Sequence, residues 1–107
     1  MNGRGTSPLR LDGLDAMVTG AAQGLGLAIA ERLALDGASV IMADLQADKV
    51  RTAAVRLAEQ GFQVESVPLD ITDSDRVTEL FTKLAGQRDG LDILVNNAGL
   101  GQDVAAV

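Results

Sequence analysis

The feature that most constrains this chain is a short apolar segment that turns through three glycines into a helix-forming segment. Residues 16–26 read A-M-V-T-G-A-A-Q-G-L-G. The opening Ala-Met-Val suits a buried parallel strand. Beyond the glycines, Leu25, Ile29 and Leu33 form one i, i+4 row, which predicts an α-helix. The glycines therefore lie where a strand becomes a helix.

Each glycine of this turn has an expected role. Gly20 can adopt backbone angles closed to other residues, Gly24 lets a ligand approach the main chain, and Gly26 removes a side chain where helix meets strand. A helix that starts near Gly24 directs unpaired N–H groups at the turn, where they can bind a pyrophosphate. The spacing Gly-x-x-x-Gly-x-Gly differs from the familiar Gly-x-Gly-x-x-Gly. The loop alone is thus compatible with plain turn chemistry or with nucleotide binding.

An acidic residue favours nucleotide binding. Asp44 ends the second apolar run, residues 38–43, and follows the loop by about 20 residues, as the dinucleotide fingerprint requires. A carboxylate there accepts hydrogen bonds from the ribose hydroxyls and repels a 2′-phosphate, which predicts NAD over NADP. The alternative is a solvated aspartate in a turn.

Apolar runs and helix-forming segments alternate along the rest of the chain. We expect strands at 16–18, 38–43, 62–69 and 91–95, and helices at 24–36, at 47–60 and from Thr72 or Asp73. A spacing of roughly 25 residues is one strand and helix unit, so the fold class is α/β, a partial Rossmann-type doubly wound parallel sheet with helices on both faces. The expected strand order is 3-2-1-4. Pro68 favours an edge position for the third strand, because proline cannot donate a ladder hydrogen bond.

Polar residues follow the third and fourth strands, at the edge where ligands of such sheets lie. Asp70 closes the third strand and could be a binding residue or a turn residue only. Asn96 and Asn97 close the fourth strand and are costly to bury unless they are hydrogen-bonded. Ala98 and Gly99 keep side-chain bulk low beside a sugar. For the asparagines, ligand contact and bracing between strands both remain open.

Together these motifs resemble the short-chain dehydrogenases and reductases over about residues 11–100. The resemblance implies an oxidoreductase that transfers hydride between NAD and a carbinol or carbonyl substrate, with this chain as its coenzyme-binding half. It also implies that Asp70 and the backbone after it contact adenine. Relatives that prefer NADP often carry Arg or Lys at the position of Gln23, so a neutral residue there agrees with NAD. The cofactor-binding residues that the resemblance implies are Gly20, Gln23, Gly24, Leu25, Gly26, Asp44, Leu45, Asp70, Ile71, Asn97, Ala98 and Gly99.

No catalytic residue can be carried over from that family. Its members use a Tyr, a Lys four residues later and a Ser, but this sequence has no Tyr and no Ser after Asn96. Its two lysines, Lys49 and Lys83, fall in expected surface helices. We therefore expect residues 1–10 to be a flexible leader and residues 11–107 to be an NAD-binding half-domain, truncated before the catalytic segment and inactive alone. A small-molecule substrate is expected only in a full-length form.

Composition excludes several other functions. The net charge of −6 and the lack of a basic cluster argue against nucleic acid and anionic membrane surfaces as partners. The absence of Cys and His removes disulfides, thiol chemistry and the commonest metal ligand, and we expect no metal site. No apolar run approaches the roughly 18 residues of a membrane helix, so we expect a cytoplasmic protein.

Two alternatives to the oxidoreductase interpretation remain. One is a non-catalytic nucleotide-binding or interaction module. The other is a methyltransferase-like fold, against which N-N-A-G at residues 96–99 argues. The outer edge of the fourth strand, beside Ile93 and Val95, would be unpaired, which predicts self-association through that edge.

Overall fold

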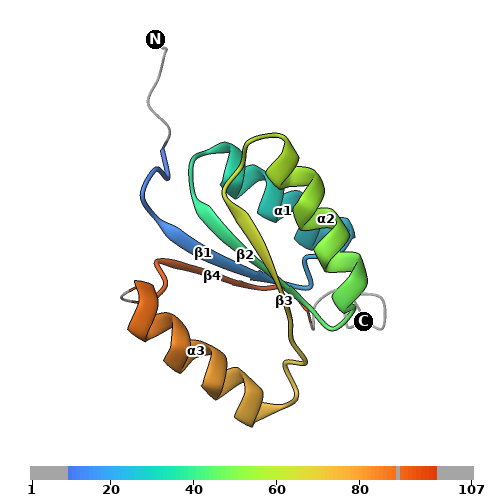
Figure 1. Cartoon of the computed structure of the whole chain (residues 1–107), viewed down its shortest axis with the longest axis vertical. Helices are drawn as coiled ribbons and strands as arrows, with labels where there is room; N and C mark the ends of the chain where they lie inside the picture. Colours follow the sequence, from blue (N-terminus) through green and yellow to red (C-terminus); the bar gives the residue numbers. More distant parts are fainter. Residues whose placement is uncertain (1–9, 89, 99–107) are drawn as a thin grey trace.

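Four parallel strands and three helices form a doubly wound α/β unit, shown in a computed structural model that describes residues 10–88 and 90–98 (Figure 1). The strands are β1 (Asp15–Thr19), β2 (Ser39–Asp44), β3 (Val64–Pro68) and β4 (Ile93–Asn96). The helices are α1 (Gly24–Leu35), α2 (Ala47–Glu59) and α3 (Ser74–Arg88). The sheet order β3-β2-β1-β4 confirms the predicted topology, with β3 at one edge.

The helices cover both faces of the sheet, as predicted. Alternate residues of the strands point to opposite faces, so Val18 of β1 packs under α1 and α2 while its neighbour Met17 packs under α3. In Figure 1, α1 and α2 lie on one side of the strands and α3 lies on the other. Met17 and Ile41 are fully buried against Leu84 of α3. The core is therefore two aliphatic layers separated by the sheet.

Small residues form the inward face of α1. Gly26, Ala30 and Ala34 are its buried residues and follow one another at i, i+4. The i, i+4 row that predicted this helix begins at Leu25, whose side chain is 67% exposed. Glycine and alanine occupy the inward face because their small size lets the helix backbone approach β1 and β2 closely. The larger leucines and Ile29 are left to the flanks and to solvent.

The start of α3 settles which residue caps it. The Asp73 side chain accepts a hydrogen bond from the N–H of Arg76 at 3.2 Å, and its carbonyl oxygen accepts one from the N–H of Val77 at 3.1 Å. Asp73 is therefore the N-cap. Thr72, the other candidate, donates its hydroxyl to Asp70 instead.

None of the helices in the described ranges is long and apolar enough to cross a membrane.

Candidate functional site

The carboxyl ends of three neighbouring strands meet at the loop that joins β1 to α1. Thr19 of β1 is in register with Ala43 of β2 on one side and with Asn96 of β4 on the other. The loop starts at Gly20, and α1 starts at Gly24. The N-cap residue of this helix, Gln23, makes no side-chain hydrogen bond to it, and no acidic residue lies in its first turn. Its first N–H groups and positive dipole end can therefore bind an anion.

The three glycines of the loop are required for different reasons. Gly20 has a φ of +67°, and a Cβ there would lie 2.9 Å from Cα of Ala98. A Cβ at Gly26 would lie only 2.0 Å from the carbonyl oxygen of Gly20. Gly24 also has a positive φ, +60°, but a Cβ there would meet no atom of the described residues within 4 Å. Packing excludes side chains at the first and third positions, whereas the space at Gly24 is open.

Thr19 ties the end of β4 to β1, a role that sequence reasoning missed. Its side chain is buried, and its Oγ1 accepts hydrogen bonds from the N–H groups of Asn97 at 2.9 Å and Ala98 at 3.1 Å. The same hydroxyl lies 3.1 Å from Oδ1 of Asn96, to which it can donate. The only sequence signal was a hydroxyl residue at a strand end directly before Gly20.

The two asparagines after β4 have different environments. Asn97 is buried, and its Nδ2 donates to the carbonyl oxygen of Gly20 at 3.3 Å. Asn96 is exposed. Both side chains therefore brace the sheet edge: Asn97 holds the glycine loop to the end of β4, and Asn96 accepts the Thr19 hydroxyl from β1. Contact of either residue with a cofactor stays a prediction.

Asp44 joins the glycine loop to the turn after β2. Its Oδ2 accepts a hydrogen bond from the N–H of Ala22 at 3.0 Å, and its Oδ1 accepts one from the N–H of Gln46 at 2.9 Å. The carboxylate therefore faces the loop. Each of its oxygens has a second lone pair that could accept a ribose hydroxyl.

Asp70 lies farther out on the same edge and is held by its own turn. Its Oδ1 accepts hydrogen bonds from the Thr72 hydroxyl at 2.6 Å and from the Thr72 N–H at 2.9 Å. The side-chain bond, and then the backbone bond, hold the pKa of this exposed carboxyl below its ordinary value. Asp70 thus stabilises the turn after β3 through Oδ1. Contact of Asp70 with a cofactor stays a prediction.

Exposed apolar side chains surround this polar edge. Leu45 follows β2 and is 70% exposed, and Ile71 follows β3 and is 39% exposed. The ends of these strands are adjacent, since the N–H of Leu69 donates to the carbonyl oxygen of Asp44 at 2.9 Å. Gln23, immediately before α1, is also exposed. Gly99, the remaining candidate, lies outside the described residues.

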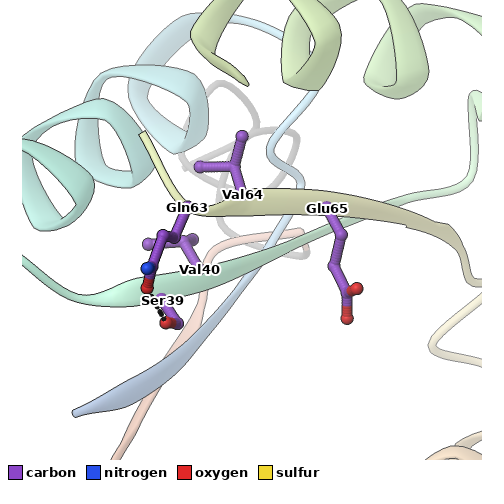
Figure 2. A pocket seen from close by; sticks show the side chains of 5 residues that line it. All are labelled: Ser39, Val40, Gln63, Val64 and Glu65. Carbon is purple, nitrogen blue, oxygen red and sulfur yellow. Dashed lines mark hydrogen bonds between the residues drawn. The ribbon is translucent and has the colours of Figure 1, made fainter. Parts of the chain in front are cut away.

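A shallow cavity of about 250 Å³ lies at the opposite end of the strands (Figure 2). It is lined by the start of β2 and by residues of and next to β3, and Ser39 donates its hydroxyl to Oε1 of Gln63 at 2.7 Å beside it. Because β2 begins at Ser39 and reaches the glycine loop only at Asp44, this cavity is no part of the candidate site. Within the described ranges, no cluster of three His, Cys, Asp or Glu side chains could hold a metal ion.

Comparison with known proteins adds independent evidence. A profile of the family described as short chain dehydrogenase matches residues 15–107. The uncharacterized oxidoreductase YxjF of Bacillus subtilis (strain 168) is 46% identical over 92 residues, which cover 86% of this chain and 35% of the relative. The chain spans about a third of the length of the curated relatives it matches.

Solved structures share the fold. The crystal structure of hydroxysteroid dehydrogenase from Escherichia coli matches with a TM-score of 0.76 and 36% identity, over 83% of this chain and 38% of the other. A metagenomic short-chain oxidoreductase in complex with NADP matches with a TM-score of 0.74 and 32% identity, over 78% of this chain and 38% of the other.

Proposed function

The chain belongs to the short chain dehydrogenase family, and we propose that it forms the coenzyme-binding part of an oxidoreductase that transfers hydride between NAD and a carbinol or carbonyl substrate. Because the chain spans about a third of its relatives' length, hydride transfer and its substrate are proposed for a full-length form. For this chain the proposal is cofactor binding, with residues 11–107 as the NAD-binding half-domain.

The geometry of the glycine loop is the observation that carries the proposal. The diphosphate of the cofactor would lie against the first N–H groups of α1, above Gly24, where no atom in the described part of the chain would contact an added Cβ. Gly20 and Gly26 let the loop pack tightly enough to present those groups. The N–H groups then stabilise the diphosphate by charge-assisted hydrogen bonds.

The carboxylate of Asp44 would bind the adenosine ribose. It already faces the loop through its bond to Ala22, and it can accept the 2′- and 3′-hydroxyls with its remaining lone pairs. A 2′-phosphate at the same place would meet a like charge. This repulsion supports NAD as the preferred cofactor.

The outer residues of the edge complete the proposed site. The exposed side chains of Leu45 and Ile71 would cover the adenine ring, with Asp70 beside it. On the other side of the loop, the segment after β4 would lie along the nicotinamide end of the cofactor. The full proposed set is Gly20, Gln23, Gly24, Leu25, Gly26, Asp44, Leu45, Asp70, Ile71, Asn97, Ala98 and Gly99.

The bound nicotinamide would supply the hydride donor or acceptor, and this chain's residues would hold and orient it. The sequence has no Tyr to act as the family's acid or base. We therefore propose that the chain alone binds cofactor without turnover.

Calorimetric titration of the chain with NAD, NADP and S-adenosylmethionine tests the proposal. We expect saturable binding of NAD, weaker binding of NADP and none of S-adenosylmethionine. Gly24→Ala adds a methyl group to the loop, and Gly61→Ala, at the end of α2, is the matched control. Both glycines have a positive φ and open space around the missing side chain, so both variants should lose about 1–2 kcal/mol of stability.

Only the Gly24→Ala variant should also lose NAD affinity, by about tenfold or roughly 1.4 kcal/mol. Equal affinity in the two variants would show that the diphosphate lies elsewhere. A wild-type chain that binds neither dinucleotide would overturn the proposal and leave an interaction module as the better interpretation.

A further inference from the structure

Three Asp-Gly pairs occur in the sequence, at residues 12–13, 36–37 and 89–90. In such a pair the backbone nitrogen of the glycine can attack the side-chain carboxyl carbon of the aspartate, because glycine has no Cβ to hinder the approach. The first two pairs lie within the described residues, whereas Asp89 lies outside them. The structure gives these two pairs very different surroundings, so we expect them to differ in reactivity.

The turn that precedes β1 leaves the first pair unrestrained. Residues 11–14 form a β-turn, closed by a hydrogen bond from the N–H of Leu14 to the carbonyl oxygen of Leu11 at 3.0 Å. Asp12 and Gly13 at the centre of this turn are both exposed. Among the described residues, the Asp12 carboxylate has no hydrogen bond or ion pair, and the N–H of Gly13 donates no hydrogen bond. Neither reacting group is therefore held by another part of the described chain.

The second pair, at the end of α1, is restrained at both reacting groups. The carboxylate of Asp36 pairs with Nε of Arg32 at 3.3 Å, and the N–H of Gly37 donates to the carbonyl oxygen of Ala34 at 3.0 Å. Its glycine has a positive φ, +106°, like the +84° of Gly13, so the two pairs share the conformation of the glycine as well as the sequence. Reaction at this pair requires both contacts to break.

We propose that Asp12 is a site of spontaneous modification, at which the chain forms isoaspartate through a cyclic succinimide. The nitrogen of Gly13 loses its proton and forms a bond to Cγ of Asp12, while one carboxyl oxygen leaves as water. A second water molecule then breaks the bond between the backbone carbonyl carbon of Asp12 and that nitrogen. The main chain afterwards runs through Cγ, and the carboxylate remains on Cα. One water leaves and one enters, so the step needs no oxidant or reductant.

The modification would lengthen the main chain by one methylene between two anchored residues. The N–H of Leu11 donates to the carbonyl oxygen of Asp36 at 2.8 Å, and the carbonyl oxygen of Leu14 accepts the N–H of Ser39 at 2.9 Å. We expect the longer chain to lose the bond that closes the turn or one of these anchors, and so to melt at a lower temperature. The turn precedes the start of β1, whereas the glycine loop follows its end, so this inference does not depend on the proposed function.

Incubation of the folded chain at neutral pH, followed by peptide mapping, is the test. Trypsin cleaves after Arg10, Arg32 and Lys49, which places the two pairs in separate peptides, 11–32 and 33–49. Chromatography with mass spectrometry detects the succinimide by the loss of one water and isoaspartate by its changed retention. We expect conversion at Asp12 to be about tenfold faster than at Asp36, the factor that a backbone hydrogen bond and an exposed ion pair together can provide.

The same incubation in concentrated urea separates structure from sequence. Urea removes the contacts around Asp36, so the two sites should then react at similar rates. A tenfold contrast that persists in urea would come from the neighbouring residues and would overturn the proposal. Equal rates in the folded chain, or conversion at Asp12 only after unfolding, would overturn it as well.

Asp12→Glu tests the effect on stability. Glutamate keeps the charge but would have to close a larger ring, so this variant should show no conversion in peptide 11–32 and should keep its melting temperature during incubation. The matched control, Asp36→Glu, should convert at Asp12 as the wild type does. A wild-type chain that converts at Asp12 and still melts unchanged would contradict the expected loss of stability.

Discussion

At the scale of single residues, the site depends on two side chains that satisfy main-chain groups. Thr19 holds two N–H groups of the segment after β4, and Asp44 holds the N–H of Ala22 in the loop and that of Gln46 beyond β2. Each residue therefore joins two segments that are distant in sequence. A buried N–H that lost its acceptor would cost about 1–3 kcal/mol.

The charge of Asp44 should set the cofactor preference. Asp44→Asn keeps one acceptor oxygen for a backbone N–H but removes the negative charge. We expect the ratio of NADP to NAD dissociation constants to fall about fivefold, which corresponds to the roughly 1 kcal/mol of repulsion between unit charges about 4 Å apart in water. Calorimetry at fixed pH and salt measures the ratio. An unchanged ratio would remove the ribose assignment.

At the scale of helices and strands, the periodicity of apolar residues predicted the helices, the strands and their order. It did not predict which face of every helix is buried. The strands, the ends of α1 and α2 and the edge position of β3 follow from apolar runs, glycines and Pro68. The periodicity predicted α1 but did not identify its inward face, because hydrophobicity weights leucine above alanine whereas close packing on a sheet favours the smaller side chain.

The contacts of the site that the sequence did not predict join segments that are far apart in the chain and meet only in the folded protein. Asp44 could be located because its distance from the loop is fixed by one strand and helix unit. Thr19 acts on residues 78 and 79 positions later, and Lys49 meets Gln23 only because α2 begins beside the loop. Neither pairing has a local signal in the sequence.

Overpacking the inward face of α1 should destabilise the chain. Ala30 is fully buried on the face of α1 that packs on the sheet, whereas Ala28, two residues before it, is exposed. We expect Ala30→Leu to lower the free energy of unfolding by about 1–3 kcal/mol. Ala28→Leu should change it by less than about 0.5 kcal/mol. Urea denaturation followed by circular dichroism compares them, and similar losses in both variants would contradict the assignment of the inward face.

At the scale of the whole molecule, the described sheet is covered unevenly. β3, β2 and β1 lie between helices, but β4 pairs only with β1 in the described sheet, and Leu94 on its α3 side is 54% exposed. Ile93 and Val95, beside which the sequence predicted an unpaired edge, are half-buried against the α1 and α2 layer. An open strand edge beside an exposed leucine favours association between chains.

We therefore expect the chain to self-associate through β4 in a concentration-dependent manner. Leu94→Lys places a charge on that edge and should weaken association about tenfold, or roughly 1.4 kcal/mol. Leu35→Lys, at the end of α1, is the matched control, since Leu35 is similarly exposed at 48%. Sedimentation equilibrium measures the association constants. A wild-type chain that stays monomeric at high concentration would rule this edge out as an interface.

The bond between Asn97 and Gly20 has a consequence for synthesis on the ribosome. The glycine turn is translated early, but the amide that braces it is 77 residues later. A nascent chain that has emerged only as far as α2 holds β1, β2 and Asp44 but lacks this brace. We therefore expect the turn to acquire its final shape only after β4 has docked, so that the proposed binding of cofactor would be a late event in the biogenesis of this protein.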